Sequence, residues 1–427
     1  MIEWSDTELM IREAIRGFVD KEVRPHVDAL ESGELPPYEI IRKMYAAFGI
    51  GAMAEESLRR SLDRERAAQA ARAQGIEPPA RDEDTGATGE TAGREAMVAI
   101  LTSELAGVSL GIVTSMGVSV GLTAATIRSR GTLAQKERWL PKLATFEHVG
   151  AWAITEPDSG SDAFGGMTTY ARRDGEGGYL LNGRKTFITN GPYADVTVVF
   201  AKLDEGGGSG ADRRDRTVLT FVLDRGMPGF SQGKPFKKMG LMSSPTGELF
   251  FDGVRVGADR LLGEREPDAA TGDSRDEVRS GFTVERIGVA SLALGIINEC
   301  HRLSVEYARS RTLWGQEIGR FQLIQLKLAR MEIARINVQN MVFAAIEKQR
   351  AGRTISLAEA SAMKLYSAEA ATEVAMEAVQ LFGGNGYMAE YRVEQLARDA
   401  KSLMIYAGSN EIQVTHIAKG LLASGSG

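Results

Sequence analysis

The sequence has few of the residues that build disulfide frameworks or metal sites. Among 427 residues there is one cysteine, and there are four histidines. The lone Cys300 cannot form an internal disulfide, and on a predicted helix it is better explained as packing than as a nucleophile. The histidines lie too far apart for zinc or iron ligand spacing, so no metal site is predicted: His26, His148, His301 and His416.

Positive charge is not in surplus. The chain carries 51 Lys and Arg against 57 Asp and Glu, a net charge of -6. Nucleic-acid binders neutralise phosphates with clustered Lys and Arg, so no nucleic-acid partner is expected. The N-terminus has early acids and no basic start before an apolar core, so we expect no secretory signal and a cytoplasmic location.

Residues 105–127 contain no charged side chain and are long enough to span a bilayer. More than half of them are Gly, Ala, Ser or Thr, which favours a close-packed internal helix, so no membrane span is expected. Two GxSxG patterns, at 107–111 and 117–121, resemble a hydrolase elbow. An elbow requires a preceding strand, which is missing here, so small-residue packing is favoured over a serine nucleophile.

Three segments with different patterns follow one another along the chain. Residues 1–148 and 281–427 show apolar residues at helical spacing, whereas 149–270 contains short β-branched and aromatic runs. The separators between these runs are too short for crossover helices, which favours an antiparallel barrel or sandwich. The charged and turn-rich residues 55–93 are predicted to form an inserted surface segment. The expected class is a multidomain α+β protein.

Several loops could present polar donors to a ligand. The stretches 152–162 and 187–191 each run from a strand into a turn that is rich in hydroxyl and backbone donors. Residues 384–389 fit the dinucleotide pattern G-x-G-x-x-A, but they follow a helix, so a nicotinamide site is disfavoured. In the run RDAKSLMIYAGSNEIQ, a turn at 406–408 precedes Ser409, the predicted N-cap of a last helix.

Taken together and in this order, these segments resemble the acyl-CoA dehydrogenase family. The resemblance rests on AWAITEPDSGSD, LNGRKTFITN, ELFFDGVRV, RSRTLWG, QLFGGNGY and RDAKSLMIYAGSNEIQ. It implies an N-terminal α-helical domain, a middle antiparallel β-barrel domain and a C-terminal four-helix bundle.

The resemblance also implies FAD, held between the β domain and the bundle, with its adenine end reaching a neighbouring subunit. Positions that match flavin-ring contacts are Trp152, Ile154, Thr155, Gly160, Ser161, Phe187, Ile188 and Thr189. Positions that match pyrophosphate and adenine contacts across the interface are Arg311, Leu313, Trp314, Gln322, Gln380, Gly383 and Gly384. Ser409 and Glu411 match two more flavin contacts.

The implied substrate is an acyl-CoA thioester. Ser161 matches a position near its pantetheine arm, and Arg286 matches one near the nucleotide end, where an arginine would meet phosphates. The remaining positions that match substrate contacts are Phe282, Tyr406, Ala407 and Gly408.

The expected catalytic base is displaced from its usual place in the family. Most members carry Tyr-Glu-Gly at the turn, but this chain has Ala407, which offers a backbone N–H and cannot accept a proton. Isovaleryl-CoA and long-chain members place the glutamate immediately before the arginine, where this chain has Glu285. Glu285 would remove the α-proton while the β-hydrogen leaves as hydride to FAD. The simpler alternative is a solvated glutamate in the first turn of a helix.

Other interpretations stay open at this stage. A flavin oxidase or monooxygenase could share the fold, and a non-catalytic acyl-binding or scaffold subunit would need no base. By resemblance, the electron acceptor is an electron-transfer flavoprotein and the assembly is a homotetramer, a dimer of dimers. The residues do not specify the length, branching or sterol-like character of the acyl group.

Overall fold

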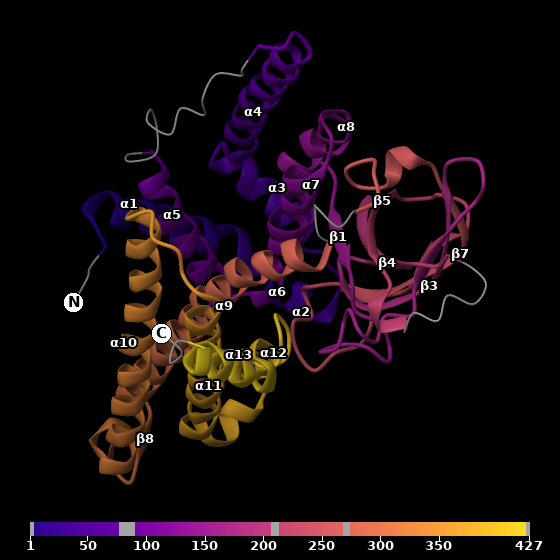
Figure 1. Cartoon of the computed structure of the whole chain (residues 1–427). Helices are drawn as coiled ribbons and strands as arrows, with labels where there is room; N and C mark the ends of the chain where they lie inside the picture. Colours follow the sequence, from indigo (N-terminus) through magenta and orange to yellow (C-terminus); the bar gives the residue numbers. More distant parts are fainter. Residues whose placement is uncertain (1–3, 77–89, 206–212, 268–273, 424–427) are drawn as a thin grey trace.

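The structure is a computed structural model that describes residues 4–76, 90–205, 213–267 and 274–423; within these ranges, the side chains of 90–94, 213, 274–280 and 282 are not described. Helices from both ends of the chain pack together on one side, and a β domain lies on the other side (Figure 1). The expected order of helical, β and helical segments is therefore present.

The N-terminal helices begin at sequence-encoded caps. Ser5 and Glu8 form a capping box at the first helix, and Thr132 and Gln135 form another at α8. The α-helices are α1 (Asp6–Phe18), α2 (Val27–Ser32), α3 (Tyr38–Ala47), α4 (Ile50–Ala73), α5 (Glu90–Ala106), α6 (Leu110–Met116), α7 (Ala125–Arg130) and α8 (Leu133–Ala144). The π-helical segments are η1 (Val19–Val23) and η3 (Gly117–Ala124), and η2 (Arg24–His26) is a 3₁₀ turn.

The small-residue helix runs from α6 through η3 to α7. By length and composition Leu110–Arg130 could cross a membrane, but half of its apolar window is buried inside the protein. Its tight packing explains the glycines, because a Cβ on Gly111 would lie 2.2 Å from the Ser243 Oγ. The serines of both GxSxG patterns are also used in packing: the Ser109 and Ser243 hydroxyl oxygens lie 2.7 Å apart, and the Ser119 Oγ accepts the Gly150 N–H at 2.8 Å. The packing interpretation is confirmed.

The β domain is one seven-stranded sheet in the order β1-β4-β2-β3-β7-β6, with β5 paired to β4. Its strands are β1 (Gly150–Ala153), β2 (Tyr170–Arg173), β3 (Tyr179–Thr189), β4 (Val196–Leu203), β5 (Val218–Asp224), β6 (Phe230–Gln232) and β7 (Thr246–Val256). Short 3₁₀ turns occur at η4 (Arg213–Asp215) and η5 (Ala258–Arg260). Buried residues line β4 and β5 on both faces, because other elements cover the sheet there.

The sheet differs from the expected antiparallel barrel. β1 and β2 both pair with β4 in parallel, at its two ends, whereas the other pairs are antiparallel. Among the described residues the path of pairings ends at β1 and β6, with β5 paired to β4, and no pairing joins these strands into a closed barrel. The barrel is therefore not confirmed, and the sheet is mixed rather than antiparallel, because β1 enters from α8 and β2 follows a long loop rather than a hairpin turn. Strand content is visible in a sequence, but strand direction depends on how such loops return.

The C-terminal helices are long. They are α9 (Ser274–Ser310), α10 (Gln322–Arg350), α11 (Leu357–Phe382), α12 (Val393–Leu403) and α13 (Asn410–Ala423). A small hairpin of β8 (Thr312–Leu313) and β9 (Gln316–Glu317), with the turn η6 (Ile318–Arg320), joins α9 to α10, and η7 (Gly383–Tyr387) follows α11. Helix α9 approaches α5 closely, because a Cβ on Gly295 would lie 2.1 Å from the Ser103 carbonyl oxygen.

Three hydrophobic cores hold the chain together. The largest contains buried residues of both the N-terminal and the C-terminal helices, so these two segments stabilise each other. A second core fills the β domain, and a third packs α4, α7 and α8 against β4 and β5. The third core therefore joins the N-terminal helices to the sheet, and the first core joins them to α9.

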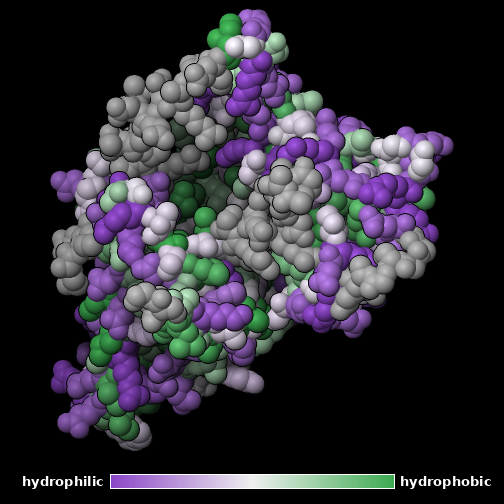
Figure 2. Space-filling model, viewed as in Figure 1, coloured by the Kyte–Doolittle hydropathy of each residue, from purple (hydrophilic) through white to green (hydrophobic). Residues whose placement is uncertain are grey.

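Part of the expected surface segment is helical. Residues 55–73 belong to α4, which projects from the molecule and is mostly hydrophilic, whereas 77–89 lie outside the described residues (Figures 1 and 2). Leu58 and Leu62 are buried against α8, and Lys136 pairs with Glu65 at 2.8 Å. These contacts hold the middle of α4 against α8.

Candidate active site

Glu285 is a half-buried carboxyl on α9, eleven residues after the first residue of that helix. Burial raises its pKa to about 7, and the charges of Arg286 and Lys364 oppose part of that rise. A carboxyl with this pKa changes protonation near neutral pH, which suits a general base. The solvated-glutamate alternative does not describe this environment.

The turn 406–408 contains a strained backbone. Ala407 has φ 56° and Gly408 has φ 80°, both in the left-handed region. For a residue other than glycine this conformation costs about 1 kcal/mol or more. Gln413 holds it in place, because its Nε2 donates to the carbonyl oxygens of Ala407 at 3.0 Å and Gly408 at 2.7 Å. Among the described residues no group accepts the Ala407 N–H.

Tyr406 lies beside the carboxyl of Glu285. Burial, followed by the charge of Glu285, raises the pKa of the Tyr406 hydroxyl well above its usual range. The Thr114 side chain is the polar neighbour of this hydroxyl, but Thr114 donates its own bond to the Leu110 carbonyl at 2.9 Å. Residues of α6, α9 and the α12–α13 turn therefore meet at one place.

Two strand ends in the β domain form a second group of expected residues. The Thr186 N–H donates to the Thr155 carbonyl at 2.9 Å, which ties the end of β1 to the end of β3. β3 has an irregularity between Lys185 and Ile188, and there Phe187 takes φ 57° and is 66% exposed. Strained backbone of this kind concentrates at ligand sites.

A buried ion pair lies directly behind these strand ends. The Lys185 Nζ lies 2.8 Å from the Glu156 Oε1, and the two side chains are 0% and 2% exposed. Glu156 also accepts from the Thr168 N–H at 2.6 Å and the Thr169 N–H at 2.9 Å. Burial alone would raise the pKa of Glu156, but the charge of Lys185 brings it down to about 2.

This pair is not apparent from the sequence, where Glu156 is one residue of the donor-rich loop 152–162 and Lys185 lies 29 positions away in another segment. One signal was present: LNGRKTFITN places a lysine inside a predicted strand, at a position that alternation would bury. A partner for it could not be chosen without the fold.

The strand ends suit a flat, polar-edged ring such as flavin. Trp152 and Phe187 offer aromatic surfaces, and the hydroxyls of Thr155 and Thr189 offer donors beside them. The Trp152 Nε1 donates to the Thr126 Oγ1 at 3.2 Å, which orients its ring. Ile154 and Ile188 are buried under the same surface. The residues present therefore fit FAD.

The residues expected at the adenine end lie elsewhere. They are exposed and gather where α9 and α11 end: Arg311, Leu313, Trp314, Gln322, Gln380, Gly383 and Gly384. Tyr307 connects the two helix ends, because its ring stacks on Phe382 at 4.0 Å and its carbonyl accepts the Arg311 N–H at 2.8 Å. Figure 1 shows β8 far from the β domain. One chain therefore does not bring these residues to the flavin surface.

The other expected residues occupy the margins of the site. Gly160 and Ser161 are exposed in the loop before β2, and Arg286 is buried beside the 406–408 turn. Ser409 directly precedes α13, and Glu411 lies in the first turn of that helix. The side chain of Phe282 lies outside the described part of α9.

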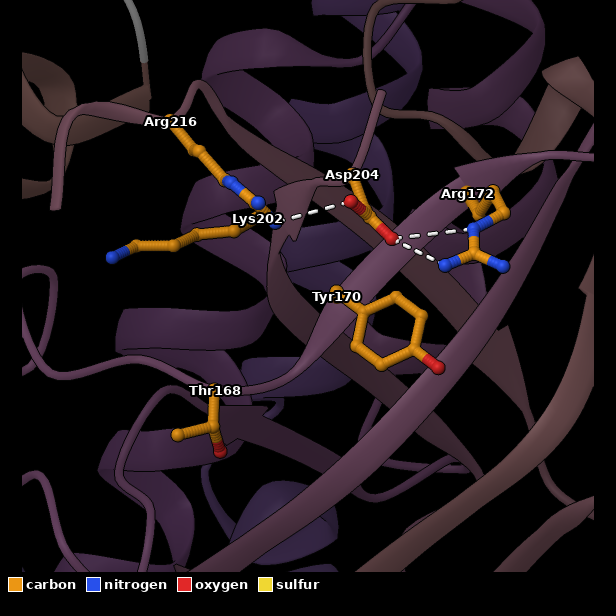
Figure 3. Close-up of a pocket in the computed structure, with 6 residues that line it drawn as sticks. All are labelled: Thr168, Tyr170, Arg172, Lys202, Asp204 and Arg216. Atoms are coloured by element: carbon orange, nitrogen blue, oxygen red, sulfur yellow. Dashed lines mark hydrogen bonds and ion pairs between the residues drawn. The ribbon is translucent and has the colours of Figure 1, made fainter. Parts of the chain in front are cut away.

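A polar pocket lies in the β domain, apart from the Glu285 site (Figure 3). Its volume is about 450 Å³, and it is lined by Thr168, Tyr170, Arg172, Lys202, Asp204 and Arg216. Asp204 accepts from the Arg172 Nη2 at 2.6 Å and the Arg216 Nη1 at 3.1 Å. The Lys202 Nζ donates to the Gly165 carbonyl at 2.9 Å, in the loop that carries Ser161. Three cations against one carboxylate make the pocket basic.

Metal and thiol chemistry find no support in the described ranges. No group of three or more His, Cys, Asp or Glu residues there could hold a metal ion. Cys300 is buried, and burial raises the pKa of its thiol far above the usual range. It is an inert packing residue, as predicted.

Comparison with known proteins finds relatives along most of the chain. Three family profiles match successive parts of the chain: the acyl-CoA dehydrogenase N-terminal domain over 52–147, the middle domain over 151–254 and the C-terminal domain over 276–422. An acyl-CoA dehydrogenase of Bacillus subtilis is 34% identical over 97% of this chain and 98% of its own length.

Other relatives differ in their named substrates. An isovaleryl-CoA dehydrogenase of Oryza sativa is 36% identical over 74% of this chain and 73% of its own length. The solved butyryl-CoA dehydrogenase of Megasphaera elsdenii has a TM-score of 0.81 and 32% identity, over 99% of this chain and 100% of that one.

Proposed function

Because the chain belongs to the acyl-CoA dehydrogenase family, we propose that it converts an acyl-CoA thioester to the trans-2-enoyl-CoA with Glu285 as the base. The protein is an oxidoreductase, and FAD is the cofactor of this family. When bound, FAD supplies the hydride acceptor for the β-hydrogen. The observation that carries the proposal is the half-buried Glu285 carboxyl, whose pKa burial raises to about 7.

Residues of this chain would accept the α-proton and stabilise the thioester carbonyl. Glu285 takes the α-proton, so the carboxylate becomes neutral while the Cα–H bond breaks and the Cα=Cβ bond forms. The Ala407 N–H, which no described residue accepts, would donate to the thioester carbonyl and stabilise its developing negative charge. Tyr406 and the half-buried surroundings keep water away from the carboxyl.

The two groups of expected FAD residues suggest a shared site. Trp152, Thr155, Phe187 and Thr189 would hold the ring, and Ser409 and Glu411 would contact it from α13. The exposed residues around Trp314 would bind the pyrophosphate and adenine of a neighbouring subunit's FAD, since they lie far from this chain's own ring surface. We therefore propose a homotetramer, arranged as a dimer of dimers, with an electron-transfer flavoprotein as acceptor.

Coenzyme A carries phosphates, so its nucleotide end needs positive charge. Arg286 was expected to bind the nucleotide end of coenzyme A. It is buried, however, and it lies beside the 406–408 turn, since a Cβ on Gly408 would be 3.5 Å from its Nη2. The basic pocket around Lys202 borders the loop that carries Ser161 and offers a second place for phosphate.

An acyl-CoA panel tests the proposed function. The purified protein, reconstituted with FAD, is mixed with straight, branched and bulkier acyl-CoA thioesters and a dye acceptor. We expect dye reduction and enoyl-CoA product with at least one thioester, and bleaching of the flavin when the dye is omitted. A yellow protein that leaves every thioester unchanged would overturn the proposal. Rapid reoxidation by air would favour the oxidase alternative.

The pH dependence of turnover follows from the protonation state of Glu285. Burial raises its pKa to about 7, and only the ionised carboxylate can accept a proton. Activity is therefore lost as pH falls through 7 and gained as pH rises. We expect kcat/KM to increase roughly tenfold from pH 6 to pH 8. A profile without an acidic limb in this range would contradict the assignment of Glu285.

A further inference from the structure

Lys364 is a lysine in the interior of the C-terminal helices. It lies on α11 and is 0% exposed. Lysine is almost never fully buried unless its ammonium group has partners, because removing that charge from water is costly. The groups that bind its ammonium therefore indicate the role of this buried lysine.

Among the described residues, the Lys364 ammonium group donates two hydrogen bonds, and both end at the 406–410 segment. Its Nζ donates to the Gly408 carbonyl oxygen at 2.8 Å and to the Asn410 Oδ1 at 3.0 Å. The lysine thus bridges the strained turn and the first residue of α13. The Gln413 Nε2, 2.7 Å away, donates to the same Gly408 oxygen from the α13 side. Two donors from two helices therefore hold one carbonyl.

This carbonyl lies in the peptide plane that follows Gly408, and the plane that follows Ala407 is held by Gln413, whose Nε2 donates to the Ala407 carbonyl at 3.0 Å. Ala407 and Gly408 both have positive φ, a conformation that persists in a non-glycine residue only when its surroundings impose it. A side chain at 408 is excluded as well, because its Cβ would lie 2.7 Å from the Gln413 Nε2. Lys364 and Gln413 therefore hold the two peptide planes that follow Ala407, and through them the strained backbone from which the Ala407 N–H projects.

The charge of Lys364 also reaches the proposed base. The charged groups that face the lysine are Glu285 and Arg286 from α9, Glu411 from α13 and Glu369 from α11 itself. Tyr406 from the turn faces Glu285 as well. Burial lowers the pKa of Lys364 to about 8, so the ammonium form still dominates at neutral pH. Opposite charges favour each other's ionised forms strongly where water is excluded.

We propose that Lys364 is a positioning residue of the dehydrogenation reaction, which orients the Ala407 N–H through the Gly408 carbonyl and favours the ionised form of Glu285. The inference rests on the proposed function, since it assigns the lysine a role toward that base and that donor. A lysine with a purely structural role would fix the turn without affecting the ionisation of Glu285. The pH profile separates these two roles.

The test compares kcat/KM profiles of four FAD-loaded variants with wild type. Lys364→Gln keeps a donor and removes the charge, Lys364→Met removes both, and Lys364→Arg keeps the charge. Lys401→Gln is the matched control, because it removes a lysine from α12 whose side chain is exposed. FAD content and Tm are measured for each variant.

We expect the acidic limb of Lys364→Gln to move up by about one pH unit, with activity recovering at high pH. At pH 7 this corresponds to roughly a fivefold loss of kcat/KM. Lys364→Met should show the same shift and, in addition, a lower kcat at every pH, because the Gly408 carbonyl loses one of its two donors. Lys364→Arg and Lys401→Gln should keep the wild-type midpoint.

Asn410→Asp is the second probe in case the Lys364 variants do not fold. It places a carboxylate at the position of the Oδ1 that Lys364 contacts at 3.0 Å, so it offsets the lysine charge with little change in size. The acidic limb of the kcat/KM profile should again move to higher pH. Unchanged midpoints in Asn410→Asp and in every folded Lys364 variant would overturn the inference. Absence of turnover in wild type and Lys401→Gln alike would instead contradict the proposed function.

Discussion

Glu285→Gln is expected to lower acyl-CoA dehydrogenation by about 10²- to 10⁴-fold, the range typical of losing a general base. The amide has the shape of the carboxyl but cannot take the α-proton at neutral pH. FAD should remain bound, because none of the residues at the expected flavin surface depends on the charge at 285. The measurements are enoyl-CoA formation with a dye acceptor and the flavin absorbance of the purified variant.

Glu306→Gln is the matched control, since Glu306 is an exposed glutamate on the same helix that pairs with Arg302 at 2.7 Å. It should retain wild-type turnover. In the double variant Glu285→Gln/Ala407→Glu, a carboxyl returns from the turn, and we expect partial recovery if positions 285 and 407 flank the same α-carbon. Near wild-type activity in Glu285→Gln alone would remove Glu285 from the mechanism.

Lys185→Met is expected to destabilise the protein by about 3–5 kcal/mol, because it leaves the buried Glu156 carboxylate without its cation. It should also weaken FAD binding. Glu156 follows Thr155 and Lys185 precedes Thr186, so the pair braces the two strand ends that the Thr186 to Thr155 hydrogen bond joins at 2.9 Å. Urea unfolding followed by circular dichroism and the ratio of flavin to protein measure the two effects.

The pH dependence of this variant has a definite sign. In wild type the folded pKa of Glu156 is about 2, below the ordinary value of 4.5, so its contribution to stability is present above pH 4.5 and is lost as pH falls toward 2. Without Lys185, burial raises the pKa of Glu156 instead. The difference from wild type should therefore be largest near pH 7 and should shrink toward pH 5.

Two further variants isolate the ion pair. Glu156→Gln/Lys185→Met removes both charges and should be more stable than Lys185→Met alone. Arg255 is an exposed arginine on β7 that pairs with Asp174 and Glu176, which lie between β2 and β3, and Arg255→Met should change the free energy of unfolding by less than about 1 kcal/mol. Equal losses in Lys185→Met and Arg255→Met would contradict a special role for the buried pair.

Local features were predictable from the sequence because they depend on near neighbours. Helical spacing indicated the helical segments, and the small residues of 105–127 indicated close packing. The resemblance added FAD and directed attention from Ala407 to Glu285. The sheet is mixed rather than antiparallel and the barrel is not confirmed, because the directions of β1 and β2 depend on how long connections return to the sheet.

The sequence by itself determined the family and the order of helical and β segments, and the resemblance it carries led to the proposal of Glu285 in place of the alanine at the turn. Only the tertiary structure decided which buried charges face one another: Lys185 with Glu156, and Lys364 with the Gly408 carbonyl and the Glu285 region. The physical reason is that propensity and capping act over a few residues, whereas the protonation and direction of a buried group depend on partners brought close by folding. Glu285 and Lys364 are 79 positions apart in the chain (364 minus 285), yet the charge of each acts on the other.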